Sequence, residues 1–302
     1  MKGRNPVAVI VTAPPYAGYL SEVASHPLVC GFRLNTVMPL RETPQEVLRR
    51  LSELGKPLWV DLKGRQLRVV GAAIPPYTEV RISHKIKVTT PVNAFFSDGT
   101  EHARIVAVDG DRLILDKGPR RLIGPGESIN IVDPSLQIED TLTETDVNYL
   151  AAMKSTGLNK VLLSYVEMPE DVAEVKSHLP EAEVMLKIET QKGVEFAGKN
   201  GNRSGRLVAA RGDLFVEMNR PHQIIGALQN IIRADPTAVA ASRILNSLAT
   251  HPVPGSADIS DVAYLFSLGY RTLMLGDSIC FDRNTLIEAL NLLDAISQQI
   301  CL

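Results

Sequence analysis

Val184-Met-Leu-Lys-Ile-Glu-Thr190 and Arg206-Leu-Val-Ala-Ala-Arg-Gly-Asp-Leu214 are two apolar runs that each end in charged residues. A continuous apolar run of this length is typical of a strand that is buried on both faces of a parallel sheet. In α/β folds, the carboxyl ends of such strands carry the reactive groups. Lys187, Glu189 and Asp213 would then form a compact site for a divalent cation and an anionic substrate. Taken alone, the same pattern fits a surface ion pair between Lys187 and Glu189 and a helix cap at Asp213.

The two runs belong to a longer alternation of apolar strands with helical patterns. The predicted strands begin with these two and include residues 7–12, 28–34, 58–62, 160–165, 238–242 and 272–275. Helices are predicted at residues 20–25, 43–55, 143–156, 169–179, 221–234, 260–268 and 284–300. Strands that alternate with helices imply right-handed βαβ units, and eight such units close as a barrel. We therefore assign the α/β class and a (β/α)8 TIM barrel, with an open doubly wound sheet as the alternative.

The pattern changes between residues 69 and 138, where short runs of alternating polarity are separated by glycine-containing turns. The runs cover residues 79–82, 85–88, 103–108, 112–115 and 128–132. Period-two runs at this spacing predict a small antiparallel β domain. We assign residues 1–68 and 139–302 to a catalytic barrel and residues 69–138 to the inserted domain. Because the insertion follows the third strand, we expect it to cover the mouth of the barrel as a lid.

Composition and charge exclude several classes of protein. The chain has 302 residues, 45% of them hydrophobic, and a formal net charge of −2 without a polybasic run, which argues against a general nucleic-acid binder. Cys30, Cys280 and Cys301 are scattered, as suits a reducing cytosol. No apolar run approaches the length of a membrane span. We expect a cytoplasmic homo-oligomer that acts on a small molecule, with no nucleic-acid or membrane partner.

Polar side chains occur at the ends of five predicted strands: Arg33 and Asn35, Asp61 and Lys63, Lys187 and Glu189, Asp213, and Ser242. In a barrel these ends lie on one rim, and this convergence is harder to explain as solvated surface than any single residue. Glu189 and Asp213 would hold Mg²⁺ or Mn²⁺ through oxygen. The cation and Lys187 would stabilise negative charge on an oxygen or a phosphoryl group. Arg33 suits a phosphate or carboxylate, and Ser242 a proton donor or a substrate contact.

A series of motifs over nearly the whole chain resembles the pyruvate kinase family, with its catalytic barrel and inserted lid. Phe32-Arg-Leu-Asn35 resembles ARLN, Asp61-Leu-Lys-Gly64 with Arg68 resembles LDTKGPEIR, Leu142-Thr-Glu-Thr-Asp146 resembles LTEKD, Lys187-Ile-Glu-Thr190 resembles KIEN, Val208-Ala-Ala-Arg-Gly-Asp-Leu214 resembles VARGDLG, Ala241-Ser-Arg-Ile-Leu-Asn-Ser247 resembles ATQMLES, Ser260-Asp-Val-Ala263 resembles SDVAN, and Met274-Leu275 resembles MLS. The chain stops with the last barrel helix. We therefore expect it to lack the family's regulatory C-terminal domain and its allosteric sugar-phosphate site.

The resemblance implies a role for each residue of the metal and phosphoryl site. Glu189 and Asp213 would bind the divalent metal that bridges the carboxylate and enolate oxygens of phosphoenolpyruvate or pyruvate. Lys187 would stabilise the phosphoryl group during its transfer. Arg33 would contact the phosphate.

The resemblance also implies contacts to the rest of the substrate and to a second cation. The backbone amides of Gly212 and Asp213 would meet the substrate carboxylate. Ser242 stands where the family has a threonine on the side from which the enolate is protonated. Asn35 and Asp61 match two ligands of the family's monovalent cation.

The chain departs from the family on the side where the nucleotide binds. Val37 and Met38 replace the family's serine and histidine, which removes a monovalent-cation ligand and a nucleotide contact. The lid segment Leu122-Ile-Gly-Pro-Gly126 has no lysine aligned with that of the family, although Arg120 and Arg121 lie close by. The use of K⁺ and of ADP or ATP as co-substrate therefore stays open.

The residues that match the family's metal and enolate site are present, whereas several of those on its nucleotide side are replaced. Three hypotheses for the function follow. The first is a compact pyruvate kinase-type phosphotransferase that acts on phosphoenolpyruvate and ADP. The second is a lyase, aldolase or decarboxylase that acts without nucleotide on a pyruvate-like 2-oxo acid. The third is a non-catalytic metabolite-binding protein, which would have no need of a phosphoryl-stabilising lysine at position 187.

Overall fold

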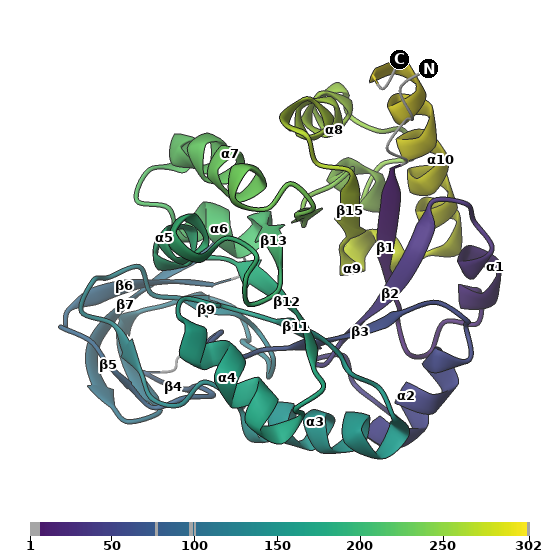
Figure 1. Cartoon of the computed structure of the whole chain (residues 1–302). Helices are drawn as coiled ribbons and strands as arrows, with labels where there is room; N and C mark the ends of the chain where they lie inside the picture. The colour runs from purple at the N-terminus through teal and green to yellow at the C-terminus, as the bar shows by residue number, and fades with distance from the viewer. Residues whose placement is uncertain (1–6, 76–77, 97–98, 100, 301–302) are drawn as a thin grey trace.

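A closed barrel of eight parallel strands forms the centre of the molecule (Figure 1). This computed structural model describes residues 7–75, 78–96, 99 and 101–300. The barrel strands are β1 (Ala8–Thr12), β2 (Val29–Asn35), β3 (Leu58–Leu62), β11 (Lys160–Leu163), β12 (Glu183–Ile188), β13 (Arg206–Ala210), β14 (Val239–Ala241) and β15 (Thr272–Leu275). Strand β1 pairs in parallel with both β2 and β15, so the sheet closes on itself. The predicted TIM barrel is confirmed, and the doubly wound sheet is excluded.

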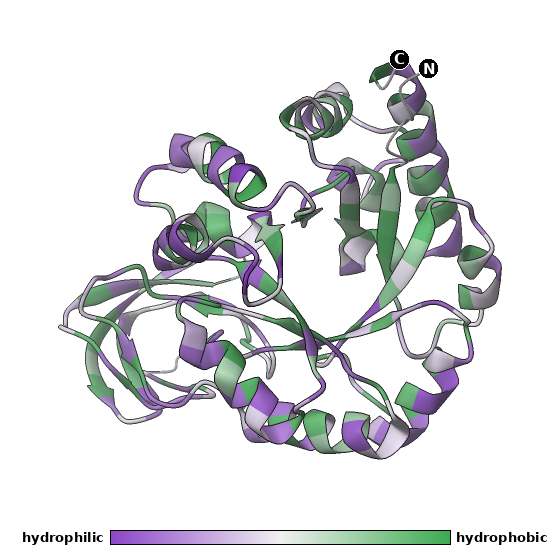
Figure 2. Ribbon diagram, in the orientation of Figure 1, coloured by the Kyte–Doolittle hydropathy of each residue, from purple (hydrophilic) through white to green (hydrophobic). Residues whose placement is uncertain are grey.

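The apolar runs fill two layers of core because alternate side chains of a strand point to opposite faces. Ile10, Leu162 and Met185 pack with five other buried side chains inside the barrel, and Trp59 is one of them. The neighbouring residues of the same strands, such as Val9 and Val11 beside Ile10, point outward and join the larger core between strands and helices. Figure 2 shows hydrophobic strands at the centre and helices with hydrophilic outer faces.

Helices surround the barrel (Figure 1). They are α1 (Leu20–Ala24), α2 (Pro44–Ser52), α3 (Glu144–Thr156), α4 (Pro169–His178), α5 (Gln191–Asn200), α6 (Arg211–Glu217), α7 (Ile224–Ala234), α8 (Ser256–Leu268), α9 (Asp277–Cys280) and α10 (Arg283–Ile300), with short 3₁₀ turns η2 (Pro221–Gln223) and η3 (Asn246–Ala249). A capping box begins α2, with reciprocal bonds between Thr43 and Glu46. None of the helices in the described residues is long and apolar enough to cross a membrane.

Three helices, α5, α6 and α9, are absent from the sequence-based prediction. No helix was predicted at α5, because Gly193 and Gly198 weaken its helical pattern. A Cβ on Gly193 would lie 2.9 Å from the Val166 carbonyl oxygen, so close packing explains that glycine. The apolar run that begins at Arg206 ends as a strand at Ala210, and the next residues form α6.

The inserted segment carries two antiparallel sheets with a core of their own. The larger sheet has the order β4-β8-β7-β6-β9, and β10 pairs with β5 in the smaller one. The strands are β4 (Glu79–Arg81), β5 (Ile86–Lys87), β6 (Val92–Phe96), β7 (Glu101–Asp109), β8 (Arg112–Lys117), β9 (Ile129–Asn130) and β10 (Gln137–Ile138). An inserted antiparallel domain is confirmed, although β6 and β10 were missed. The bounds 69 and 138 stay a prediction, and the described residues within them are called the lid below.

Asp146 ties the start of the lid connection to the barrel. Its carboxylate accepts the backbone N–H of Lys63 at 2.8 Å and of Gly64 at 3.1 Å, while it also caps α3 through Thr143. Gly64 has a φ of +50°, and a Cβ there would lie 2.6 Å from the Ser164 carbonyl oxygen. This turn fixes the residues that follow β3, including Lys63.

Replacement of Gly64 by alanine should destabilise the barrel, because the added methyl group meets a backbone oxygen and the backbone is left-handed there. We expect Gly64→Ala to lower the free energy of unfolding by about 2 kcal/mol. Gly18→Ala is the control, since a Cβ on Gly18 would have no atom within 4 Å. Urea unfolding of both variants measures the difference. Equal midpoints for Gly64→Ala and the wild type would contradict the prediction.

Candidate active site

A polar cavity of about 250 Å³ opens at the carboxyl ends of the barrel strands. Its lining includes the predicted site residues Arg33, Asn35, Lys187, Glu189, Asp213 and Ser242, together with Lys63, Gln66, Arg68, Ser128 and Asp277. Asp61 lies behind this surface and is fully buried. Gly212 lies next to Ser242: a Cβ on Gly212 would be 3.5 Å from the Ser242 hydroxyl oxygen. The predicted residues therefore gather at one place on the rim.

The Asp61 carboxylate joins three cationic side chains. Its Oδ2 atom accepts from Arg33 Nε at 2.9 Å and Nη2 at 2.5 Å, and from Lys63 Nζ at 3.0 Å. Its Oδ1 atom lies 3.4 Å from Lys187 Nζ. Burial alone would raise the pKa of Asp61, but Lys187, Lys63 and Arg33 outweigh it and hold the pKa well below its usual range. Burial lowers the pKa of Lys63 to about 7 although Asp61 opposes this.

Lys187 and Glu189 do form the ion pair that the sequence allows, at 3.2 Å, but the pair is not at the surface. The two residues are 7% and 2% exposed. Burial opposes the charge on Lys187, yet Asp61 and Glu189 outweigh it and raise the lysine pKa. Burial raises the pKa of Glu189 to about 7 despite the opposing effect of Lys187. Ser164 Oγ fixes Lys187 Nζ at 2.8 Å, and the Tyr165 N–H donates to Glu189 at 2.9 Å.

Asp213 is held from both the barrel and the lid. It lies in the first turn of α6, and no side chain caps that helix. Gln66 Nε2 donates to its Oδ2 atom at 2.8 Å. Its Oδ1 atom accepts from Asn130 Nδ2 of the lid at 3.1 Å and from the Tyr165 hydroxyl at 3.2 Å. Asn130 and Tyr165 also donate to Glu217, at 2.9 and 3.4 Å.

Arg33 is the most heavily engaged cation of the cavity. Besides Asp61, its guanidinium reaches Thr12 Oγ1 at 3.0 Å and Asp277 Oδ1 at 2.9 Å. Asn35 Nδ2 donates to the other oxygen of Asp277 at 2.6 Å. Arginine has five N–H donors, so these contacts use four of them. One donor remains for a substrate while the ion pairs persist.

Ser242 follows β14 in a strained conformation. Its φ is +68° and that of Arg243 is +56°, which is rare for residues with a side chain. Arg211 stabilises the turn by donating to the Ser242 carbonyl oxygen at 2.9 and 3.2 Å, and Asp261 holds Arg211 at 2.6 Å. Such strain persists only where the surroundings enforce it, often at functional sites. Here it exposes the Ser242 side chain to the cavity.

The donor set fits a divalent cation that is completed by substrate. Among the described residues, no group of three or more His, Cys, Asp or Glu side chains could hold a metal. Mg²⁺ is usually bound through one or two carboxylates together with substrate oxygens and water, and Glu189 and Asp213 provide two. Asp61 does not fit a potassium site in this arrangement, because cationic side chains already contact both of its oxygens.

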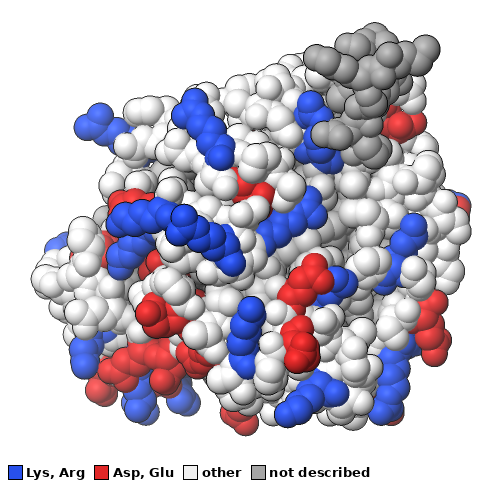
Figure 3. All heavy atoms as spheres, viewed as in Figure 1, with Lys and Arg blue, Asp and Glu red and all other residues white. Residues whose placement is uncertain are grey.

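The residues assigned to the nucleotide side are apolar at the barrel and paired within the lid. Met38 is buried, and Val37 Cβ lies 3.9 Å from the position of a Cβ on Gly126, so the lid meets the barrel here. Arg121 donates to Glu101 at 2.6 Å and also pairs with Glu127, both within the lid. On the face shown in Figure 3, basic and acidic side chains are interspersed.

The sequence analysis missed several residues that contact the predicted ones. Ser164 and Tyr165 follow β11, so the strand-end pattern that identified Lys187 could also have identified them. Asp277 follows β15, so the same strand-end pattern could also have identified it. Gln66 and Asn130 carry no such signal, because their approach to Asp213 depends on how the lid packs.

Comparison with known proteins agrees with this architecture. A sequence profile described as "Pyruvate kinase, barrel domain" matches residues 60–279. The curated pyruvate kinases of Borreliella burgdorferi and Methanocaldococcus jannaschii are each 24% identical to the chain, over 300 and 290 residues. These matches cover 89% and 90% of this chain but 62% and 64% of the relatives. That of Methylorubrum extorquens is 34% identical over 165 residues, 53% of this chain and 34% of the relative. The chain thus spans less than two thirds of the length of these relatives.

Stability should depend on pH through Glu217, whose pKa is raised to about 8, chiefly by burial. The unfolded chain ionises this group near its ordinary value of 4.5, so the native state loses stability as pH rises from about 4.5 to about 8. Glu217→Gln removes this loss. We expect the stability of the variant relative to wild type to rise by about 2 kcal/mol between pH 5 and pH 8, since partial exposure reduces the full effect.

Urea unfolding at the two pH values, without divalent cations, measures this change. Glu144→Gln, at an exposed position on α3, is the control and should show no such dependence. A pH-independent difference between Glu217→Gln and wild type would contradict the prediction.

Proposed function

We propose, from the premise that the chain belongs to the pyruvate kinase family, that it transfers a phosphoryl group between phosphoenolpyruvate and ADP. The observation that supports this most is the meeting of Lys187, Glu189, Asp213 and Arg33 in one buried cavity. The lining carries four basic side chains, Arg33, Lys63, Arg68 and Lys187, and the carboxylates of Glu189, Asp213 and Asp277. The buried carboxylate of Asp61 contacts three of the basic groups and balances the count. A divalent cation would then make the site positive, as a phosphorylated carboxylate requires.

The chain's own residues have distinct proposed roles in this reaction. Lys187 is held by Ser164, Asp61 and Glu189, so its ammonium can stabilise the phosphoryl group during transfer without reorganising. Arg33 offers its remaining N–H to the phosphate.

The backbone and a hydroxyl contact the rest of the substrate. The amides of Gly212 and Asp213 lie in the first turn of α6, where they have no acceptor within the helix, and can bind the substrate carboxylate. As the bond between phosphorus and the enol oxygen breaks, the enolate takes a proton at its methylene carbon from the side of Ser242. A divalent cation, Mg²⁺ or Mn²⁺, held by Glu189 and Asp213 would stabilise negative charge on the enolate oxygen as a Lewis acid.

A second candidate is nucleotide-independent enolate chemistry on a pyruvate-like 2-oxo acid, as in a lyase, aldolase or decarboxylase. Two observations on the nucleotide side favour this second candidate. Val37 of the barrel meets Gly126 of the lid there, and Arg121 forms its ion pair with Glu101 within the lid. A non-catalytic metabolite binder is supported less, because it has no use for a buried Lys187. Assembly as a homo-oligomer and a cytoplasmic location stay predictions from the sequence.

The decisive assay measures pyruvate formation from phosphoenolpyruvate and Mg²⁺, with and without ADP. We expect formation to require ADP and to stop when EDTA removes the metal. Lys187→Met should lower kcat by about 10³-fold or more, because it removes a preorganised charge from the phosphoryl site. Lys199→Met, at an exposed position on α5, is the control and should retain wild-type kcat.

The remaining outcomes separate the candidates. Absence of turnover with ADP, combined with metal-dependent exchange of the pyruvate methyl protons, would contradict phosphoryl transfer and favour the second candidate. Neither activity, with pyruvate binding retained, would favour the metabolite binder.

A further inference from the structure

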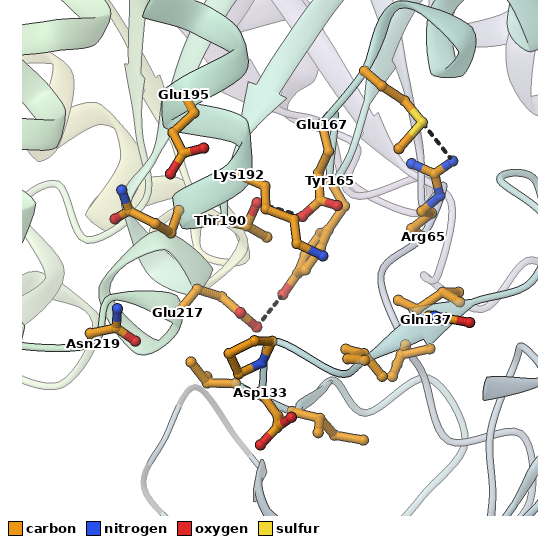
Figure 4. Close-up of a pocket in the computed structure, with 18 of the residues that line it drawn as sticks. Arg65, Asp133, Gln137, Tyr165, Glu167, Thr190, Lys192, Glu195, Glu217 and Asn219 are labelled. Atoms are coloured by element: carbon orange, nitrogen blue, oxygen red, sulfur yellow. Dashed lines mark hydrogen bonds between the residues drawn. The ribbon is translucent and has the colours of Figure 1, made fainter. Parts of the chain in front are cut away.

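A second, larger cavity of about 540 Å³ lies between the lid and the barrel (Figure 4). One wall belongs to the lid and its connection and is largely apolar, although Asp133 and Gln137 also belong to it; its apolar residues are Leu67, Ile129, Ile131, Leu136 and Ile138. The opposite wall is formed by residues that follow β11, β12 and β13. Asn130 and Tyr165 connect this cavity to the active site, because they contact Glu217 in its lining as well as Asp213. The lining itself contains none of the predicted catalytic or metal residues.

Three glutamates lie in the barrel wall, beside the polar side chains of Tyr165, Thr190, Gln191, Lys192 and Asn219. Figure 4 shows Glu167, Glu195 and Glu217 around the cavity. Glu167 accepts a hydrogen bond from Thr190 Oγ1 at 2.7 Å, and Glu217 accepts from Asn130 at 2.9 Å. Within the described part of the chain, none of the three has a basic side chain within the 4.0 Å of an ion pair.

The basic residues of the lining do not neutralise this wall. Arg65 pairs with Asp171 at 2.6 Å at the edge of the cavity. Lys192 is exposed and pairs with none of the three glutamates at ion-pair distance. A fourth carboxylate, Asp133, also lines the cavity. A cation that entered would therefore gain carboxylate contacts without displacing a basic side chain from them. At Glu217, whose pKa burial raises to about 8, it would also displace the proton that this residue holds at neutral pH.

We propose that this cavity binds a small organic cation, an amine whose ammonium group contacts Glu217 and Glu167 while its apolar body packs against the lid. Carboxylates form strong charge-assisted hydrogen bonds with ammonium groups. Burial of a ligand's hydrocarbon surface against the isoleucine and leucine side chains on the opposite wall is favourable. An anion such as a nucleotide would instead face uncompensated carboxylates.

Calorimetric titration of the full chain with 2-phenylethylamine tests the proposal, with 3-phenylpropionate as an anion of similar shape. We expect the amine to bind at least about tenfold more tightly than the acid, a difference that corresponds to about 1.4 kcal/mol. Glu217→Gln and Glu167→Gln should each weaken amine binding by about five- to tenfold. Glu195→Gln changes an exposed residue, so it tests the charge of the wall even if a buried variant misfolds; it should weaken binding by about two- to threefold.

Glu144→Gln, remote from the lining, is the matched control and should leave the amine affinity unchanged. Equal affinities for amine and acid, competition by ADP, binding unaffected in all three glutamate variants, or no amine binding at millimolar concentrations would each overturn the proposal. Pyruvate formation measured on the same samples distinguishes a failure here from a failure of the proposed function, because the cavity lining excludes Lys187, Glu189 and Arg33.

Discussion

The buried carboxylate of Asp61 is the constraint on which the active site depends. It is fully inaccessible to solvent and joins Arg33, Lys63 and Lys187, which come from the ends of β2, β3 and β12. A buried charge without a partner is strongly destabilising. The shared carboxylate therefore stabilises each of the three cations, and the cations stabilise the carboxylate. The mutual requirement fixes three basic side chains at one rim before any substrate binds. Together with Glu189, it also explains why Lys187 stays charged although its side chain is buried.

The second half of the site is organised across the boundary between barrel and lid. Asp213 belongs to the barrel, yet Gln66 and the lid residue Asn130 donate to its carboxylate oxygens. Asp146 fixes the connection by which the chain leaves the barrel. A displacement of the lid would therefore change the contacts of Asp213, whereas the Asp61 cluster would keep its own. The cations that contact Asp61 therefore keep their positions, whereas the surroundings of Asp213 depend on the position of the lid.

Much of this arrangement could be predicted from the sequence because its signals are local. Apolar runs that end in charge identified the barrel strands and brought Arg33, Lys187 and Glu189 to one rim. The helix α5 was missed because two glycines weaken its pattern, and only the tertiary structure reveals the close packing that requires one of them, Gly193. Gln66 and Asn130 could not be found in this way, since no periodicity says which lid side chains face the barrel. The strain at Ser242 is likewise set by Arg211 and Asp261, which hold its carbonyl group from outside the strand.

We propose that Glu189 and Asp213 bind a divalent cation that completes a site for a small enolate-like dianion. Calorimetric titration with oxalate, a planar dicarboxylate that resembles the enolate of pyruvate, tests it most directly when performed with and without Mn²⁺. The account predicts that oxalate binds at least about a hundredfold more tightly with Mn²⁺, and that Glu189→Gln abolishes this enhancement. Oxalate binding that is equally tight without the metal, or an enhancement that survives Glu189→Gln, would contradict it.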